Sequence, residues 1–222
     1  MARRSMFLKC NSPHMKQTLI QTIETFLKEG IIEPVAPNQF QEEQLNLFFP
    51  IPKKNSNKLR WILDLSHLGK YLKKKSYKME TVNFIREMIS PGDWMISIDI
   101  VDAFYHLLLH PQARKYCRFM ALNTKWQFRA LPMGLSNSPW ALSRIMGEFV
   151  RRMREKGIRL SCYVDDLILV ASTKEECNNH RDVVLNQMEQ LGILLNISKS
   201  TLTPTQKLSH LGYVFDTAKN RV

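Results

Sequence analysis

The sequence predicts an α+β fold, because strand-like apolar segments and amphipathic helices follow one another without the strict alternation of parallel α/β sheets. Hydrophobic residues make up 44% of the 222 residues and charged residues 23%, which is enough apolar material for a core. No apolar run approaches the roughly 18 residues that a membrane span needs. The basic start, Met1–Lys9, has too short an apolar stretch for a secretory signal. An intracellular protein of the cytoplasm or nucleus, with no membrane partner, is therefore expected.

The first third of the chain predicts an amphipathic helix, a basic hairpin and a short second helix. Ser12 and Pro13 are residue types that start helices, and Gly30 is of the type that ends them. A turn rich in Lys, Asn and Ser between two apolar segments is typical of a hairpin. The predicted elements are a helix over 13–29, an extended segment over 31–35, hairpin strands over 45–52 and 59–65, and a helix over 79–89.

The rest of the chain predicts a second hairpin, two longer helices and several apolar strands. Ser138 and Pro139 start the clearest helix, whose apolar stripe continues until Gly157. Thr173 and Glu176 have the spacing of a capping box at the start of another helix. The predicted strands cover 94–98, 116–122, 126–131, 160–164, 167–170, 194–197 and 208–216, and the helices run from 138 to the glycine at 157 and from 173 to the glycine at 192.

The charge distribution favours a polyanionic partner. Lys and Arg number 32 against 20 Asp and Glu, which gives a net charge of +12. The excess is concentrated in residues 53–78, where Asp64 is the single acid. A basic surface of this kind suits nucleic acid or an anionic membrane, although a solvated face that keeps the protein soluble would have the same composition.

Three aspartates are the candidate chemical groups. Asp165 and Asp166 are adjacent between two apolar strands, where a turn would explain one acid but two repel each other unless a cation neutralises them. Asp99 ends the apolar strand 94–98, where a lone acid is more often hydrogen-bonded than catalytic. If these strands are neighbours, the carboxylates converge on a site that favours Mg²⁺. The four cysteines lie far apart, which argues against a disulfide framework or a zinc site.

Several motifs in order resemble those of reverse transcriptases. Ser97–Phe104 (SIDIVDAF) resembles motif A, Leu131–Pro139 (LPMGLSNSP) motif B, and Tyr163–Asp166 (YVDD) motif C. Each motif alone is weak, but their order along one chain is specific. The resemblance covers residues from about 15 to 217 and is strongest to the enzymes of gypsy-like, long-terminal-repeat-type and DIRS-like retrotransposons. Further similar segments are 30–35, 49–54 and 59–64 in the fingers, 191–199 as motif D and 211–213 as the primer grip.

The resemblance implies the fingers and palm of a right-hand polymerase. The palm of that family has a ferredoxin-like antiparallel sheet with packed helices. Residues 1–75 and 107–137 match the fingers, and residues 76–106 and 138–222 match the palm. A thumb and a ribonuclease H domain are expected to lie outside this chain, in the downstream part of a parent polyprotein.

The resemblance also implies a role for each residue that matches a motif position. The acids and the carbonyl of Ile100 would hold two Mg²⁺ ions, with Mn²⁺ as a substitute. Lys199 matches a general acid, although a lysine after a strand is usually only exposed. Phe104 matches the ring that excludes ribonucleotides, although core packing would also explain a phenylalanine. The implied metal ligands are Asp99, Ile100, Asp165 and Asp166, the catalytic residues are Asp99, Asp165, Asp166 and Lys199, and the nucleotide-binding residues are Lys53, Arg60, Ile100, Ala103, Phe104 and Met133.

Two positions depart from the family pattern. Met133 stands where many retroviral enzymes have Gln and many gypsy-type elements have Phe, which puts the contacts to the nucleotide in doubt. Gly69 stands where Asn is usual, which would loosen the turn after the fingers strand. Lys53 and Arg60 match the residues that clasp the incoming triphosphate, but a solvated basic hairpin would look the same.

The function that follows from the resemblance is RNA-directed DNA polymerisation. The substrates would be a dNTP and an RNA or DNA template with its primer. A decayed or repurposed copy that only binds nucleic acid is the first alternative, and the three intact acids argue against it. An RNA-dependent RNA polymerase is the second, and Phe104 argues against it because such enzymes more often have a polar residue there.

Overall fold

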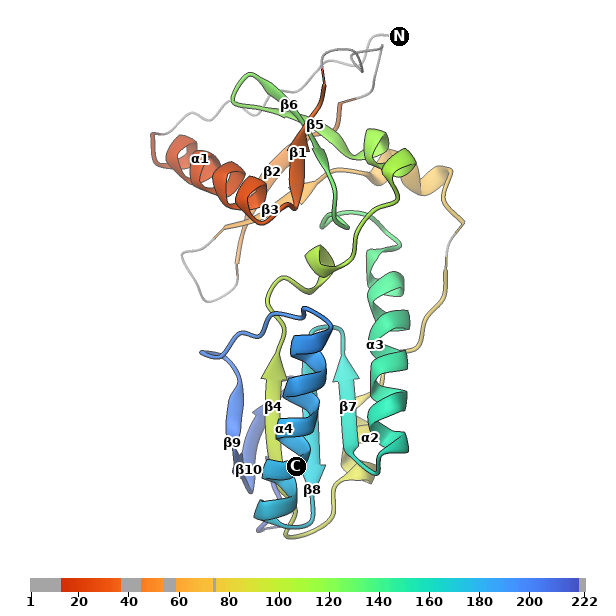
Figure 1. Cartoon of the computed structure of the whole chain (residues 1–222), viewed down its shortest axis with the longest axis vertical. Helices are drawn as coiled ribbons and strands as arrows, with labels where there is room; N and C mark the ends of the chain where they lie inside the picture. Colours follow the sequence, from red (N-terminus) through yellow and green to blue (C-terminus); the bar gives the residue numbers. More distant parts are fainter. Residues whose placement is uncertain (1–12, 37–44, 54–58, 74, 220–222) are drawn as a thin grey trace. The chain divides into compact units, whose positions relative to one another are not determined.

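The computed structural model describes residues 13–36, 45–53, 59–73 and 75–219 (Figure 1). Its internal contacts divide the chain into two compact units. Unit 1 comprises Met1–Lys75 with Phe104–Ser138, and unit 2 comprises Ser76–Ala103 with Pro139–Val222. Helices and antiparallel strands are mixed in the α+β manner that the sequence predicts. The names fingers and palm for the two units stay a prediction.

Unit 1 is built around a small aromatic core. One antiparallel sheet has the strand order β1-β6-β5, and β2 with β3 forms a separate hairpin. The rings of Phe48 and Phe119 lie 4.4 Å apart between centroids, and the ring of Phe128 lies 5.5 Å from that of Phe119. These rings hold the hairpin and the sheet together. The elements are α1 (Pro13–Lys28), β1 (Ile32–Pro34), β2 (Phe48–Pro52), β3 (Leu59–Leu63), η2 (Ser66–Lys70), η4 (Pro111–Cys117), β5 (Arg118–Ala121) and β6 (Thr124–Phe128), and η3 (Ala103–His106) begins at the unit boundary.

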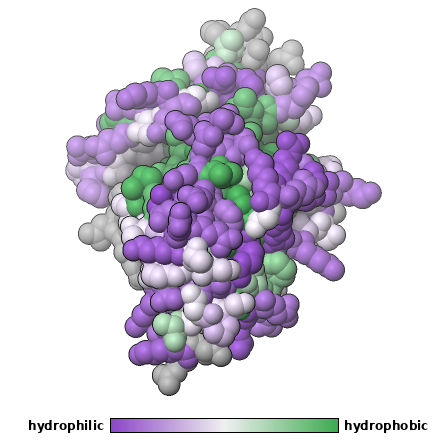
Figure 2. Space-filling model, turned by 60° about the horizontal axis from the view of Figure 1, so that its bottom comes forward, coloured by the Kyte–Doolittle hydropathy of each residue, from purple (hydrophilic) through white to green (hydrophobic). Residues whose placement is uncertain are grey.

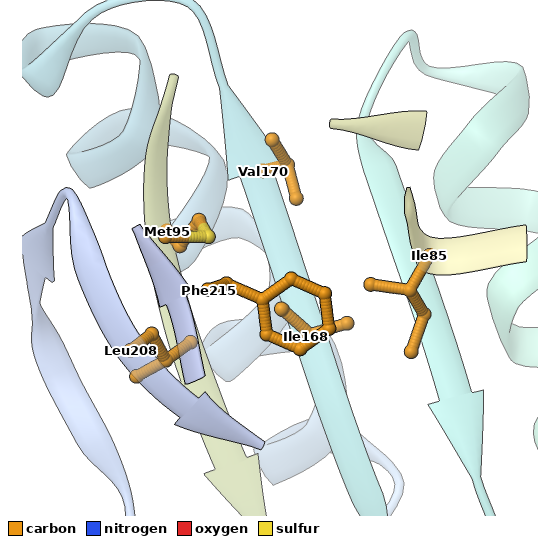
Figure 3. Close-up of a cluster of buried hydrophobic side chains, with 6 residues drawn as sticks. All are labelled: Ile85, Met95, Ile168, Val170, Leu208 and Phe215. Atoms are coloured by element: carbon orange, nitrogen blue, oxygen red, sulfur yellow. The ribbon is translucent and has the colours of Figure 1, made fainter. Parts of the chain in front are cut away.

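Unit 2 contains a four-stranded antiparallel sheet with the order β7-β8-β4-β9. Helix α4 lies across this sheet and contacts β8, β9 and β4 (Figure 1). A buried cluster joins the sheet to α2 and to the hairpin β10–β11 (Figure 3). Its members are Ile85, Met95, Ile168, Val170, Leu208 and Phe215. The elements are α2 (Val82–Met88), β4 (Trp94–Asp99), α3 (Ser138–Glu155), β7 (Arg159–Tyr163), β8 (Asp166–Ala171), α4 (Lys174–Gln190), β9 (Thr201–Thr205), β10 (Lys207–His210) and β11 (Tyr213–Asp216).

The predicted start of helix α4 is confirmed, and a capping side chain fixes it. Thr173 accepts a hydrogen bond from the Glu176 N–H at 3.1 Å, and the Glu176 carboxylate accepts one from the Ser172 N–H at 2.8 Å. The short helix over 79–89 begins later than predicted, at Val82, because Thr81 caps it.

The described residues include no helix that is both long and apolar enough to cross a membrane. On the face drawn in Figure 2, hydrophilic residues cover most of the surface.

Two strand predictions near the C-terminus were wrong, and one strand was missed. Residues 194–197 do not form a strand, and Leu195 makes only an isolated bridge with Ile100. Residues 208–216 form a hairpin instead of one strand, because Leu211 and Gly212 take positive φ angles of 51° and 81° and reverse the chain. Strand β9 was not predicted. Its proline is tolerated because β9 lies at an edge of the sheet, where one side needs no ladder partner.

Candidate active site

The pairing of β4 with β8 brings two of the predicted acids together. Asp99 ends β4, Asp166 begins β8, and the antiparallel register places them directly opposite each other. Because side chains alternate along a strand, both point to the same face of the sheet as the neighbouring Met95 and Ile168. The two strands are held in this register by apolar residues buried on both faces. The completely or almost completely buried ones are Met95, Ile96, Ile98, Leu167, Leu169 and Val170.

The third acid is tied to the same end of the sheet by the backbone. Val164 and Asp165 form the two-residue turn between β7 and β8. The Asp165 carbonyl accepts a hydrogen bond of 3.0 Å from the N–H of Ile100, which directly follows Asp99. Val164 has a φ of 60°, which is a strained conformation for a β-branched residue and costs about 1–3 kcal/mol. The turn is therefore held by its neighbours and not by its own preference.

The electrostatics of the cluster are dominated by negative charge. The pKa of Asp166 is raised from 3.8 to about 6, mainly by burial and then by the charges of Asp165 and Asp99, while Lys199 lowers it. The Lys199 Nζ lies 3.7 Å from Asp99 Oδ2, and about half of the lysine side chain is exposed. An ion pair that exposed contributes about 1 kcal/mol at most. One lysine therefore compensates only part of the repulsion among the three carboxylates.

The three acids suit a hard divalent cation in their chemical type, but their side chains are not grouped as a ligand set. Carboxylate oxygens are the ligands that Mg²⁺ prefers, and a cation would relieve the repulsion that adds to the effect of burial on the pKa of Asp166. Within the described parts of the chain, however, no three Asp, Glu, His or Cys side chains are grouped closely enough to form a ligand set. The backbone N–H of Ile100 is occupied by Asp165, and the role of its carbonyl as a ligand stays a prediction.

The polar segment 196–200 positions Asp99 and Lys199, a role that the sequence analysis did not predict. The Ser200 hydroxyl accepts a hydrogen bond of 3.0 Å from the Asp99 N–H, and the Asp99 carbonyl accepts one of 2.8 Å from the Asn196 N–H. Ser200 also donates to the Asn196 carbonyl at 2.8 Å. The segment replaces the predicted strand over 194–197. The signals in the sequence were the similarity of 191–199 to motif D and the change from apolar residues to Asn-Ile-Ser-Lys-Ser over 196–200.

The remaining predicted residues are divided between the units. Lys53 follows β2, and Arg60 is exposed on β3 opposite Ile51. Phe104 is half-buried and begins the second segment of unit 1, Phe104–Ser138. Ala103 is buried and ends the first segment of unit 2, Ser76–Ala103. The structure thus brings Asp99, Asp165, Asp166, Ile100 and Lys199 together within unit 2, while Lys53, Arg60, Phe104 and Met133 belong to unit 1.

The motif around Met133 is anchored to β3 within unit 1. The Met133 carbonyl accepts a hydrogen bond of 2.9 Å from the Leu63 N–H. Gly134 has a φ of 113°, and a Cβ atom there would lie 2.0 Å from the Leu63 carbonyl oxygen. Only glycine permits this close approach. Met133 is therefore fixed by its backbone, although its predicted contact with a nucleotide stays a prediction.

Comparisons with known proteins agree with the motifs. The sequence model of the family described as "Reverse transcriptase (RNA-dependent DNA polymerase)" matches residues 51–215. "Protein P" of Duck hepatitis B virus (strain China) is 27% identical over 170 residues, which are 73% of this chain and 21% of that protein. The "Retrovirus-related Pol polyprotein from transposon opus" of Drosophila melanogaster is 23% identical over 202 residues, which are 90% of this chain and 20% of that protein. The chain thus spans about a fifth of the length of these relatives.

Solved structures share the fold. The foamy viral protease-reverse transcriptase in complex with dsDNA matches with a TM-score of 0.77 and 20% identity, over 90% of this chain and 40% of that one. The same foamy viral protein in complex with an RNA/DNA hybrid matches with a TM-score of 0.75 and 18% identity, over 91% of this chain and 26% of that one.

Proposed function

The chain belongs to the reverse transcriptase (RNA-dependent DNA polymerase) family, and from this we propose that it forms the fingers and palm of an RNA-directed DNA polymerase. In the proposed reaction, the 3′-hydroxyl oxygen of a primer forms a bond to the α-phosphorus of a dNTP. The bond from that phosphorus to the bridging oxygen breaks, and pyrophosphate leaves. The observation that carries the proposal is the register of β4 and β8, which sets Asp99 opposite Asp166.

We propose that the acids of unit 2 form the ligand set of the reaction. Asp99, Asp165 and Asp166 would hold two divalent cations, Mg²⁺ or Mn²⁺, which when bound supply Lewis-acid stabilisation of the attacking and leaving oxygens. The raised pKa of Asp166 supports this assignment, because burial and the charges of Asp165 and Asp99 together disfavour its ionised form more than Lys199 offsets, and a bound cation would favour that form. The hydrogen bond from Ile100 to the Asp165 carbonyl holds the turn in place for this role.

Lys199 is proposed to protonate the leaving pyrophosphate. Its Nζ is 3.7 Å from Asp99 Oδ2, and its side chain is half-exposed, so it can reach from the acids toward a substrate. The Ser200 hydroxyl and the Asn196 backbone fix the segment that carries it. A lysine suits this task because its ammonium is a compact donor of protons.

The residues of unit 1 are proposed to bind the nucleotide. Arg60 and Lys53 would contact the triphosphate, the arginine through its bidentate fork and the lysine as a point charge. Phe104 would exclude ribonucleotides by crowding the 2′ position of the sugar, and Ala103 and Met133 would line the same nucleotide. These assignments rest on the places of the residues in the family motifs and not on contacts within the described residues.

The proposed partners are a template with its primer and a dNTP, inside the cell. The net charge of +12 supports a nucleic-acid partner, and the solved foamy viral structures are complexes with dsDNA and with an RNA/DNA hybrid. The opus relative is a Pol polyprotein, which supports the proposal that this chain is part of a parent polyprotein. A thumb and a ribonuclease H domain in that polyprotein rest on the family resemblance alone.

Primer extension by the purified chain tests the proposal. An RNA template with a labelled DNA primer should be extended in the presence of dNTPs and Mg²⁺. Asp99→Asn and Asp166→Asn should each reduce the rate at least about a hundredfold, since a Lewis acid is worth several kcal/mol and each ~1.4 kcal/mol is a factor of ten. Asp182→Asn, an exposed acid on α4, is the matched control and should leave the rate unchanged.

Two results would contradict the proposal in different ways. Near-native incorporation by Asp99→Asn or Asp166→Asn would remove the catalytic assignment of these acids. A folded chain that binds primer–template but never extends it, with Mg²⁺ or with Mn²⁺, would support the decayed or repurposed binding domain instead.

A further inference from the structure

Unit 1 carries an open groove that none of the predicted site residues lines. Its volume is about 840 Å³, and its walls are the segment 110–116 together with Glu33, Arg118 and Gln127. The helix η4 that forms one wall packs against β6. The groove therefore lies on a packed part of unit 1. Its lining residues do not include Lys53, Arg60 or Met133.

Buried hydrogen bonds hold the wall of the groove in place. The Asn46 side chain, which is 8% exposed, donates to the carbonyls of Tyr116 at 2.9 Å and Arg118 at 2.8 Å. The Arg118 side chain is 4% exposed and donates from its Nε to Gln127 Oε1 at 2.8 Å. A preorganised wall binds a ligand without first having to be ordered, which favours binding.

The groove has an excess of positive charge among its described lining residues. Glu33 is the only carboxylate there, and its oxygens accept hydrogen bonds from Gln127 at 2.7 Å and from Arg114 at 3.1 and 3.3 Å. Arg129 adds an ion pair to the same carboxylate at 3.5 Å. Several donors thus share one acid, and the Nε of Arg114 is buried without a hydrogen-bond partner among the described residues. An anionic group in the groove would neutralise this excess.

An exposed aromatic ring stands beside these cations. Tyr116 lines the groove with 53% of its surface exposed, and Lys115 Nζ lies 5.2 Å from its ring centroid. Proteins that bind single-stranded nucleic acids combine a cationic groove along the backbone with aromatic rings on which bases stack. A duplex does not offer its stacked bases to such a ring, so the combination favours a single strand.

We propose that this groove is a second nucleic-acid site, which binds a single-stranded segment. Lys115 and Arg114 contact its phosphates, and the ring of Tyr116 stacks on one base. The site does not include the acids of unit 2, so it stands whether or not the chain polymerises. The identification of the strand as uncopied template is the one part that rests on the proposed function.

Binding of short labelled oligonucleotides to the full chain tests the proposal. The probes are a 5′-fluorescein oligonucleotide of about 15 nucleotides without self-complementarity, as RNA and as DNA, and a blunt DNA duplex of the same length. Tyr116→Ala should weaken single-strand binding about five- to a hundredfold, which corresponds to the loss of one stacked base, and should leave duplex binding within about twofold. Tyr116→Phe keeps the ring and should bind nearly as the wild type does.

Charge variants provide the second measurement. Lys115→Ala should reduce the slope of log K against log salt for the single strand by about 0.7, as the loss of one phosphate contact predicts. Lys28→Ala, an exposed lysine in the last turn of α1 in the same unit, is the matched control and should not change the slope. Asp166→Asn should bind the single strand as the wild type does, so failure of the polymerase proposal would leave this result unaffected.

Cross-linking uses the wild-type chain, so it tests the proposal even if a variant fails to fold. A single-stranded probe that carries 5-iodouridine should cross-link to Tyr116 of the wild-type chain on irradiation, as shown by peptide mass spectrometry. Absence of this cross-link would overturn the proposal. Unchanged binding by a folded Tyr116→Ala chain, or competition by polyglutamate as strong as by the unlabelled oligonucleotide, would also overturn it, and the latter would point to an acidic protein as the partner.

Discussion

Replacement of Gly134 by alanine should disrupt the contact between Met133 and β3. Gly134 has a φ of 113°, and an added Cβ would meet the Leu63 carbonyl oxygen at 2.0 Å and its carbon at 3.0 Å. The backbone must therefore move, which loses the 2.9 Å hydrogen bond from the Leu63 N–H to the Met133 carbonyl. The strain of about 1–3 kcal/mol and the lost bond of about 1 kcal/mol together predict a loss of about 2–4 kcal/mol.

Gly69→Ala is the matched control for this substitution. Gly69 lies in the same unit, has no positive φ, and an added Cβ there would have no heavy atom within 4 Å. Alanine at that position should be neutral or stabilise by up to about 1 kcal/mol, because it restricts the unfolded chain. Urea denaturation followed by tryptophan fluorescence is the assay, since Trp61 is buried on β3 next to the altered contact. A loss below about 1 kcal/mol for Gly134→Ala, or a loss equal to that of Gly69→Ala, would refute the close-approach argument.

Three further predictions concern single side chains. Asp166→Asn should raise the melting temperature near neutral pH without divalent cations, and this gain should vanish below about pH 4. The reason is that the pKa of Asp166 is about 6 in the folded chain and 3.8 ordinarily, so the wild-type fold loses stability as the pH rises from about 4 to 6. An equal gain from the exposed Asp182→Asn would contradict this. Thr173→Ala should cost about 1 kcal/mol in urea titrations by losing the cap to Glu176, whereas Thr173→Ser should not. Phe104→Ala should lower the ratio of kcat/KM for dNTP over rNTP at least about tenfold, and an unchanged ratio would make Phe104 a packing residue.

The parts of the fold that sequence reasoning reached are those with local signals. The apolar segments around β4 and β8 were predicted because strands buried on both faces read as continuous apolar runs. Helix α4 was predicted because Thr173 and Glu176 form a local hydrogen bond. The turn at Leu211 and Gly212 was missed because leucine rarely adopts a positive φ, and β9 was missed because its Thr-Pro sequence resembles a loop.

The candidate site was predictable only in part for a related reason. Asp99 and Asp166 could converge only if their two strands were neighbours, and the sequence alone did not show whether they are. The register of β4 and β8 confirms that the strands are neighbours. The hydrogen bond from the Asp99 N–H to the Ser200 hydroxyl joins residues 101 positions apart, and a local sequence pattern cannot predict such a bond. The network of Glu33 with Arg114 and Gln127 joins residues 81 and 94 positions apart and was missed for the same reason.

The end of the sheet that carries the three acids combines features that oppose folding. Burial, followed by the charges of Asp165 and Asp99, raises the pKa of Asp166. Val164 holds a φ of 60° that glycine or asparagine would adopt with less strain. A chain selected for stability alone would have neutral residues at the strand ends and a glycine in the turn. The buried pairing of β4 with β8 tolerates these features, but nothing in that pairing requires them. Their presence together is therefore better explained by a charged ligand at this site than by the needs of the fold.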